Sequence, residues 1–379
     1  MNFRIMKGGE FANTYHCFCC GASGNMLTLY AELKGLCGAD RFKQAYREIK
    51  EALAGRDPYQ GVSVAGKGIV SLKEEQPADL EQKDRVYRRL LELLPLTAVH
   101  RDKLLMRGFT ETEIQELGFR STPLSGTESL ARKLLREGYS LSGIPGFFVN
   151  RQQNWDAAFY KKNRGFLCPA YDLSGRISGF QIRLDVPYDD RKYLWFSSTN
   201  QNRGTGSGSP ITFLGNPKSK VIGVTEGILK AEAAYAMSGC SFLGVPGVNQ
   251  YRELGKALQT LKENGLEEVR EYYDMDKFLD VRCNRDYKPD ICRACTGNRT
   301  DSGTVCKQKE RKREQIRDGC RRLYEICDAL GLSCIRQVWE MDGENAWNGQ
   351  NKGIDDYWFS AGIRQRRAYM DEFYGKAAA

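Results

Sequence analysis

The sequence predicts an α/β protein whose second half forms a parallel sheet with helices on both faces. Short apolar runs alternate with helical patterns over residues 221–339, and this alternation is typical of right-handed βαβ units. Carboxylates follow several of these apolar runs, where ligands bind in parallel sheets. Ahead of this region, residues 165–196 alternate apolar and polar side chains, which indicates a β-meander.

The expected elements follow one another in a regular order. Helical periodicity runs from about 85 to 135, where Thr110 and Glu113 have capping-box form before Ile114. A strand-like segment at 211–214 follows the meander. In the second half, strands are expected at 221–225, 241–245, 268–273 and 332–339, and helices at 228–237, 251–263 and 309–330.

These patterns divide the chain into four segments. The predicted segments are a cysteine-bearing start with a helical region at 1–55, a linker at 56–84, a helical and then β-meander subdomain at 85–216, and a sheet domain at 217–379. Polar, loop-forming residues also predict an insertion in the sheet domain at 277–308.

Composition and charge narrow the possible functions. The chain has 379 residues, 41% of them hydrophobic and 28% charged, with a formal net charge of +9. Residues 281–322 contain 13 Lys and Arg against 6 Asp and Glu, which indicates either a polyanion-binding surface or a solvated helix face. No apolar run approaches the ~20 residues of a membrane span, and the start lacks a signal-peptide pattern. We therefore expect a cytoplasmic protein without a membrane partner.

Carboxylates at the expected strand ends are the candidate catalytic residues. Glu226 follows the run at 221–225, Asp274 and Asp276 follow the run at 269–273, and Asp355 and Asp356 follow Gly353-Ile354. Acids that meet at one sheet edge repel one another unless a divalent cation lies between them. Hard oxygen ligands suit Mg²⁺ or Mn²⁺ and metal-assisted phosphoryl transfer. Alternatively, Asp355 or Asp356 caps the last helix.

Thirteen cysteines without a secretion signal argue for metal ligation or burial rather than disulfides. Four of them lie in or beside the polar insertion, with a central C-x-x-C and one outlying cysteine on each side. They are Cys283, Cys292, Cys295 and Cys306. We expect them to hold a structural Zn²⁺, with an iron–sulfur cluster or free thiols as alternatives.

Several motifs resemble those of bacterial DnaG-type primases with a TOPRIM domain, in the version carried by phages, plasmids and other mobile elements. In the sheet domain these are Val-Thr-Glu-Gly at 224–227 with Lys-Ala at 230–231, Asp-Met-Asp at 274–276 and Lys-Gly-Ile-Asp-Asp-Tyr at 352–357. Ahead of it, residues 164–171, 175–180 and 191–194 resemble the basic subdomain of these primases, and residues 15–25 resemble the second half of their zinc ribbon.

The resemblance implies a ribbon that is incomplete in this chain. Cys17 and Cys20 have C-x-x-C spacing, but two ligands do not close a tetrahedral zinc site. The upstream Cys and His of the family pattern are absent from the printed sequence. We expect a shortened start, with substitution by His16, Cys19 or Cys37, or buried reduced cysteines without a metal, as the alternatives.

The resemblance also implies a function in DNA replication. The acids, with Mg²⁺ or Mn²⁺, would join nucleoside triphosphates into primers on a single-stranded DNA template, with a helicase supplied in trans. Lys230, where the family has another acid, would hold a triphosphate or lie exposed on its helix. The residues expected to contact template and nucleotide are Arg164, Arg176, Arg183, Arg191 and Lys192. A TOPRIM nuclease or topoisomerase, or a non-catalytic DNA-binding replication or defence factor, is the alternative.

Overall fold

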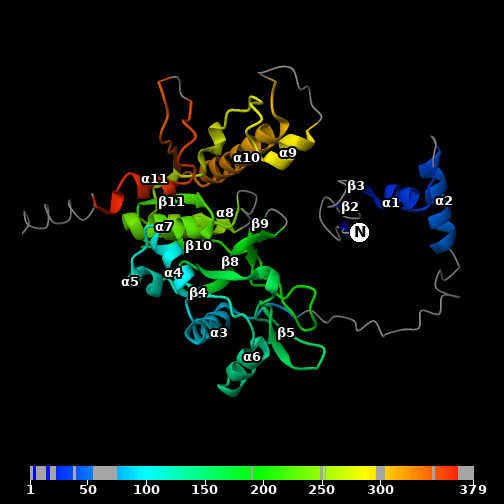
Figure 1. The fold of residues 1–379 in the computed structure, drawn as a ribbon, viewed down its shortest axis with the longest axis horizontal. Coiled ribbons are helices and arrows are strands. Elements are labelled where there is room, and N and C mark those ends of the chain that lie inside the picture. Colours follow the sequence, from blue (N-terminus) through cyan, green and yellow to red (C-terminus); the bar gives the residue numbers. More distant parts are fainter. Residues whose placement is uncertain are drawn as a thin grey trace, which may run out of the picture. The chain divides into compact units, whose positions relative to one another are not determined.

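Two units make up the chain, Met1–Ser71 and Leu72–Ala379. The structure is a computed structural model (Figure 1). The residues it describes are 3–5, 14–17, 23–36, 40–53, 75–188, 191–247, 251, 253–295, 304–343 and 346–365. Most of the predicted linker at 56–84 lies outside these residues.

The first unit contains a small antiparallel sheet and two helices. The sheet has the order β1-β2-β3. Its elements are β1 (Phe3–Ile5), β2 (Thr14–Cys17), β3 (Ser23–Asn25), α1 (Met26–Leu33) and α2 (Arg41–Leu53). The Asn25 side chain starts α1 by accepting a hydrogen bond from the Thr28 N–H at 3.0 Å. The Tyr30 hydroxyl joins the two helices by donating to Glu48 at 3.0 Å.

The second unit begins with four helices, as the helical periodicity predicted. They are α3 (Leu80–Leu93), α4 (Ala98–Leu105), α5 (Glu111–Glu116) and α6 (Thr127–Arg136). Asp79 caps α3 by accepting from the Gln82 N–H at 2.7 Å, so this helix begins inside the segment expected to be a linker. Both hydrogen bonds of the predicted capping box between Thr110 and Glu113 are present at α5.

The predicted β-meander is confirmed as part of a four-stranded antiparallel sheet of order β4-β7-β8-β9. Its strands are β4 (Arg120–Ser121), β7 (Gly165–Tyr171), β8 (Ile177–Tyr188) and β9 (Arg191–Trp195). Asp172 closes the β7–β8 turn by accepting from the N–H groups of Ser174 and Arg176 at 2.9 and 2.8 Å. The hairpin of β5 (Phe147–Val149) and β6 (Trp155–Ala157), and the 3₁₀ turn η1 (Lys161–Asn163), were not predicted.

The five-stranded sheet of the predicted sheet domain, called the second sheet below, has the order β10-β12-β11-β13-β14. Its elements are β10 (Thr212–Leu214), β11 (Val221–Glu226), α7 (Ile228–Ser238), β12 (Phe242–Val245), α8 (Leu254–Glu263), β13 (Glu268–Glu271), η2 (Met275–Phe278), α9 (Pro289–Ala294), α10 (Lys307–Ala329), β14 (Ser333–Arg336) and α11 (Ile354–Ser360). Four strands are parallel, but β10 is antiparallel to β12. The four strands predicted to be parallel, β11 to β14, are confirmed as parallel. The strand expected at 211–214 was assigned to the preceding subdomain, but as β10 it joins this sheet at its edge in the opposite direction.

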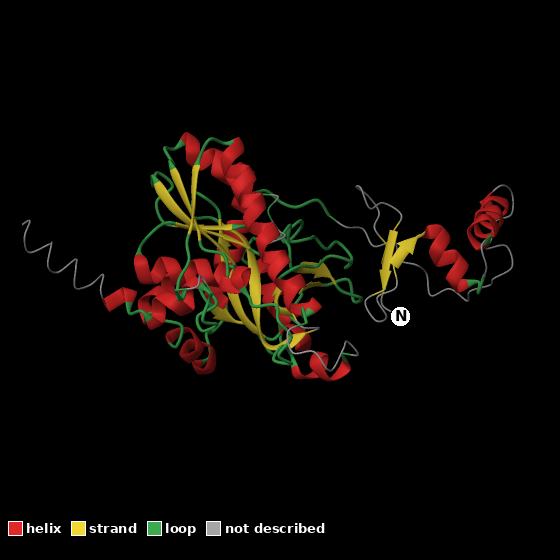
Figure 2. Cartoon of the chain, turned by 90° about the horizontal axis from the view of Figure 1, so that it is seen from above, coloured by secondary structure: helices red, strands yellow, loops and turns green. Residues whose placement is uncertain are grey.

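Helices cover both faces of this sheet, as predicted (Figures 1 and 2). On one face, α8 and α10 bury Leu258 and Leu323 in a core with Ile222 and Val224 of β11. On the other face, α7 and Ile354 of α11 share a core that continues into the meander. Among the described helices, none is both long and apolar enough to cross a bilayer.

The turn from β11 into α7 places Glu226 at the end of the sheet. Gly227, with φ +95° and ψ 135°, lies between the strand and the helix, a conformation that side chains with a Cβ rarely adopt. Its N–H donates to the Val245 carbonyl at 2.6 Å. Val224 lies opposite Glu271 in the parallel pairing of β11 with β13. The residues that follow these two positions, Glu226 and Asp274, therefore leave adjacent strands at the same end.

Candidate active site

Carboxylates from two adjacent strands meet at the carboxyl end of the second sheet, as predicted from their spacing. Asp274 and Asp276 flank Met275 at η2 and are almost fully buried. Glu226 lies close enough to be influenced electrostatically by both aspartates. One of its carboxylate oxygens, Oε2, is buried without a hydrogen-bond partner among the described residues. The site thus gathers three acidic side chains where water has little access.

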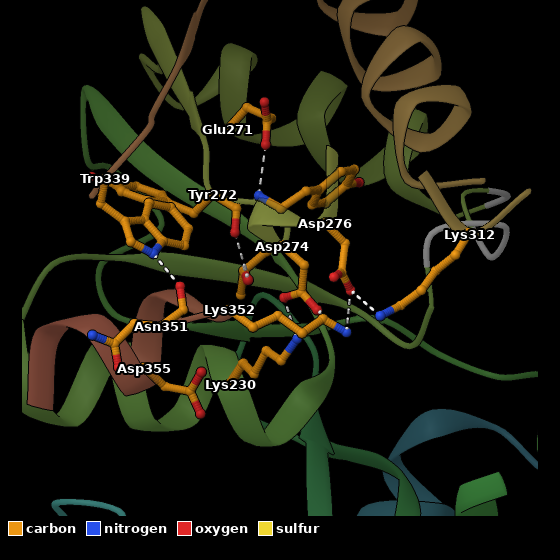
Figure 3. Close-up of polar contacts among 12 residues, drawn as sticks. Lys230, Glu271, Tyr272, Asp274, Asp276, Lys312, Trp339, Asn351, Lys352 and Asp355 are labelled. Atoms are coloured by element: carbon orange, nitrogen blue, oxygen red, sulfur yellow. Dashed lines mark hydrogen bonds and ion pairs between the residues drawn. The ribbon is translucent and has the colours of Figure 1, made fainter. Parts of the chain in front are cut away.

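Three lysines contact the two aspartates (Figure 3). Lys352 bridges them, because its Nζ lies 2.8 Å from Asp274 Oδ2 and 2.7 Å from Asp276 Oδ2. Lys230, one turn into α7, donates to Asp274 Oδ1. Lys312 of α10 lies 3.0 Å from Asp276 Oδ2. The sequence left open whether Lys230 would be an exposed helix lysine, and the structure turns it into the site.

These contacts shift the ionisation of the cluster. Burial alone would raise the pKa of Asp274, but Lys230 and Lys352 outweigh it and hold that pKa below its ordinary value. Burial raises the pKa of Glu226, opposed by Lys230 and reinforced by the charge of Asp274. Burial lowers the pKa of Lys230 and Lys352, but the aspartates outweigh it and both values are raised. Asp274 and the two lysines are therefore charged at neutral pH.

Asp355 and Asp356 occupy different environments. Asp355 is buried, and its Oδ2 lies 2.5 Å from Nη1 of Arg107, in the turn that follows α4. Its charge also acts on Lys230, so it borders the cluster. Asp356 is exposed in the first turn of α11, where a carboxylate is favoured by the helix dipole. Asp356 thus lies at the helix start, the location that the sequence analysis gave as the alternative for Asp355 or Asp356.

The donor set suits a hard divalent cation, because carboxylate oxygens are the ligands that Mg²⁺ and Mn²⁺ prefer. The buried, unpartnered Oε2 of Glu226 fits such an ion. The present arrangement does not form a cage: within the described ranges, no three acidic, histidine or cysteine side chains are arranged to hold a metal ion. Instead, the ammonium groups of lysines contact the aspartate oxygens, as Figure 3 shows.

Basic residues of the meander extend the site toward β8 and β9. The pKa of Lys192 on β9 is lowered by burial and by the nearby charges of Arg183, Lys352 and Lys230, so these cations share one region. Arg183 lies over the Tyr193 ring at 4.9 Å. Arg183 and Lys192 of the meander therefore lie in the same cationic region as Lys230 and Lys352, which contact the aspartates.

The three other residues predicted to contact nucleic acid are not placed with this cationic region. Arg176 lies at the β7–β8 turn, 2.8 Å from Asp172, seven residues and about 23 Å along the strand from Arg183. Arg164 is exposed at the end of η1. Arg191 lies over the Tyr188 ring at 5.7 Å. Of the five predicted residues, Arg183 and Lys192 are those that the structure places with the acid cluster.

The four cysteines of the insertion line one cavity of about 690 Å³. The Cys283 N–H donates to Thr304 O at 2.8 Å and the Cys306 N–H to Val281 O at 2.7 Å, which brings the outer two cysteines together. Cys292 lies in α9 and Cys295 ends it. The thiols are free, and in the described part of the chain they are not arranged as ligands. Zinc at this site stays a prediction.

The predicted zinc ribbon lies only partly within the described residues. Cys17 ends β2, whereas Cys20 lies outside the described residues. The two strands β2 and β3, which precede and follow residues 18–22, pair antiparallel. A zinc site at Cys17 and Cys20 also stays a prediction.

Sequence reasoning missed three contributors to the site. Lys352 was part of a recognised motif without a role of its own, Lys312 was one of many basic residues in its helix, and Arg107 was not considered. A further buried pair, Glu271 with Lys277 at 2.8 Å, supports the aspartate turn from the side. A lysine that directly precedes an aspartate motif, as Lys352 does, indicates a residue near the site. Whether its side chain points at the acids depends on the fold.

Comparisons with known proteins give a distant likeness. No family model and no curated protein matches the chain. Among solved structures, the chain is similar to the zinc-binding and RNA polymerase domains of the Aquifex aeolicus primase, with 14% identity, a TM-score of 0.47, and coverage of 95% of this chain and 73% of that one. It is also similar to a DnaG primase catalytic domain bound to ssDNA, with 15% identity, a TM-score of 0.43 and coverage of 77% and 78%. For the E. coli primase catalytic core the identity is 15%, the TM-score 0.35 and the coverage 67% and 92%.

Proposed function

We propose that the chain is a primase-like nucleotidyltransferase that makes short primers on single-stranded DNA. The observation that best supports this is the meeting of buried carboxylates with lysines from α7, α10 and the segment before α11 at one sheet end. Phosphoryl transfer from a triphosphate requires both kinds of group, because charge develops on the phosphate oxygens and must be stabilised. The motif resemblance to DnaG-type primases described above points to the same chemistry.

In this proposal each group of side chains has its own ligand. Lys230, Lys312 and Lys352 bind the triphosphate as flexible point charges. Arg183 and Lys192 hold the phosphate backbone of the template beside them. A divalent ion held by Glu226, Asp274 and Asp276 would neutralise the triphosphate and activate the attacking 3′-hydroxyl.

The test is primer synthesis by the purified chain. Single-stranded DNA, labelled ribo- or deoxyribonucleotides and Mg²⁺ or Mn²⁺ should give short labelled oligomers. Asp274→Asn should reduce this synthesis by about 100-fold or more, as expected when one group that stabilises transition-state charge is lost, with DNA binding retained. Glu267→Gln is the control, because Glu267 is 65% exposed and pairs with Lys220 at the opposite end of the sheet. Undiminished synthesis by Asp274→Asn would contradict the assignment.

A non-catalytic DNA-binding role is the second candidate, favoured by the lysines that already neutralise the aspartates. The same assay distinguishes it, because DNA binding without any chemistry would support the accessory role. Nicked or shortened DNA would instead support a nuclease that uses the same acids.

A further inference from the structure

Lys352 combines a hydrogen-bonded backbone with a partly exposed side chain at the centre of the site. Its carbonyl accepts a hydrogen bond from the Met275 N–H at 2.9 Å, between the two aspartates. This bond holds the segment before α11 against η2. The Lys352 side chain is 43% exposed, whereas those of Asp274 and Asp276 are 1% and 3% exposed. The ammonium group can therefore turn toward solvent while the backbone stays in place.

The cluster is close to electrically balanced by its own side chains. Glu226, Asp274 and Asp276 supply three carboxylates, and Lys230, Lys312 and Lys352 supply three ammonium groups. Lys230 and Lys312 are 21% and 36% exposed. A ligand that approaches from solvent therefore meets ammonium groups before it meets the aspartates. This order favours an anion as the first ligand.

We propose that Lys352 is a counterion switch, which releases Asp274 and Asp276 to a divalent cation when a polyphosphate binds it. The cation and Lys352 compete for the same two oxygens, Asp274 Oδ2 and Asp276 Oδ2. A triphosphate offers Lys352 and Lys312 new anionic partners, so its binding makes the aspartates available. Metal and triphosphate then bind cooperatively, and each raises the affinity for the other. This inference rests on the proposed function, because it assigns the triphosphate and the cation to this site.

The first test measures Mn²⁺ binding without nucleotide, by the electron paramagnetic resonance signal of free Mn²⁺. Lys352→Met should bind Mn²⁺ roughly tenfold more tightly than the parent chain, within the range usual for coupled sites. Lys312→Met, which frees one contact of Asp276, should give a smaller gain. Lys220→Met is the matched control, because Lys220 is 74% exposed and precedes β11 at the opposite end of the sheet. Unchanged or weaker Mn²⁺ binding by Lys352→Met would overturn the proposal.

The second test measures a fluorescent nucleoside triphosphate in the presence of a chelator. The parent chain should bind it without metal, and Lys352→Met should bind it several-fold more weakly. Equal binding by the two proteins would contradict the switch. These readouts are independent of primer synthesis: if no variant makes primers but Lys352→Met gains Mn²⁺ affinity, the switch stands and the proposed function fails. If primers are made and depend on Asp274 while Lys352→Met leaves the Mn²⁺ affinity unchanged, the proposed function stands and the switch fails.

Discussion

Replacing Arg107 by methionine tests whether the pair with Asp355 fastens α11 to α4. The two residues are 248 positions apart in the sequence and 2.5 Å apart between Nη1 and Oδ2. Removing one partner of a buried pair typically costs about 3–5 kcal/mol, because it leaves an uncompensated charge. The Arg107 side chain is 31% exposed and that of Asp355 only 3%, so water can reach the pair from one side. We therefore expect the lower end, about 3 kcal/mol in the free energy of unfolding.

The cost should depend on pH in a defined direction. Burial raises the pKa of Asp355, opposed by the charges of Arg107 and Lys230. Without Arg107 that pKa rises further. At a pH below it, Asp355 is protonated and needs no cation, so the loss of stability is small. Above it, the carboxylate is charged and unpaired, so the loss is at its full value. Urea unfolding of the parent chain and of Arg107→Met, at pH values below and above the pKa of Asp355, measures the difference in their free energies of unfolding.

The matched control is Arg101→Met within α4, the helix that ends just before Arg107. Arg101 pairs with Glu111 and Asp102, and the three side chains are 46%, 49% and 60% exposed. Surface pairs of this kind each contribute less than about 1 kcal/mol. Adding Asp355→Asn to Arg107→Met should recover most of the lost stability, because it removes the unpaired charge. If Arg107→Met is no more destabilising than Arg101→Met at neutral pH, the pair does not fasten the two helices.

Three further predictions concern other parts of the second unit. Glu232 is fully buried with both carboxylate oxygens unpartnered among the described residues, and burial raises its pKa. The destabilisation by its unpaired charge is therefore absent at low pH and grows as pH rises. Glu232→Met should raise the free energy of unfolding near neutrality by about 1–3 kcal/mol, measured by urea unfolding. Native mass spectrometry should find one zinc in the insertion, lost in Cys306→Ser and kept in the exposed-thiol control Cys240→Ser; a chain without zinc there would contradict the prediction. Arg183→Ala should weaken single-stranded DNA binding and reduce its salt dependence by about one counterion, whereas Arg176→Ala, already paired with Asp172, should not.

Local patterns were sufficient for most of the elements in the second unit. The start of α5 followed from the capping box at Thr110, and β11 followed from the apolar run before Glu226. The direction of β10 was not predictable, because a short run shows the period of a strand but not its orientation in the sheet. The last strand was expected to reach residue 339 but ends at Arg336, since β14 is an edge strand with a neighbour on one side.

The candidate site was predictable in its acids but not in its cations. Parallel strands end at one edge of a sheet, so the positions of Glu226 and Asp274 after apolar runs predicted that they lie at the same edge. That β11 and β13 are direct neighbours follows only from the fold. Lys312 belongs to a helix with basic residues on most of its faces, and only the fold shows which of them points at Asp276. The contacts of Lys352 and Arg107 likewise depend on how distant segments pack. For this reason a metal cage was expected where the structure has a network of ion pairs.

The most direct measurement is an anomalous diffraction map from crystals soaked with Mn²⁺ and a non-hydrolysable nucleoside triphosphate. We predict a peak between Glu226 and the two aspartates, with the ammonium group of Lys352 moved onto the phosphates. A map in which both ligands are present elsewhere, while Lys352 still bridges Asp274 and Asp276, would contradict a catalytic role for this cluster.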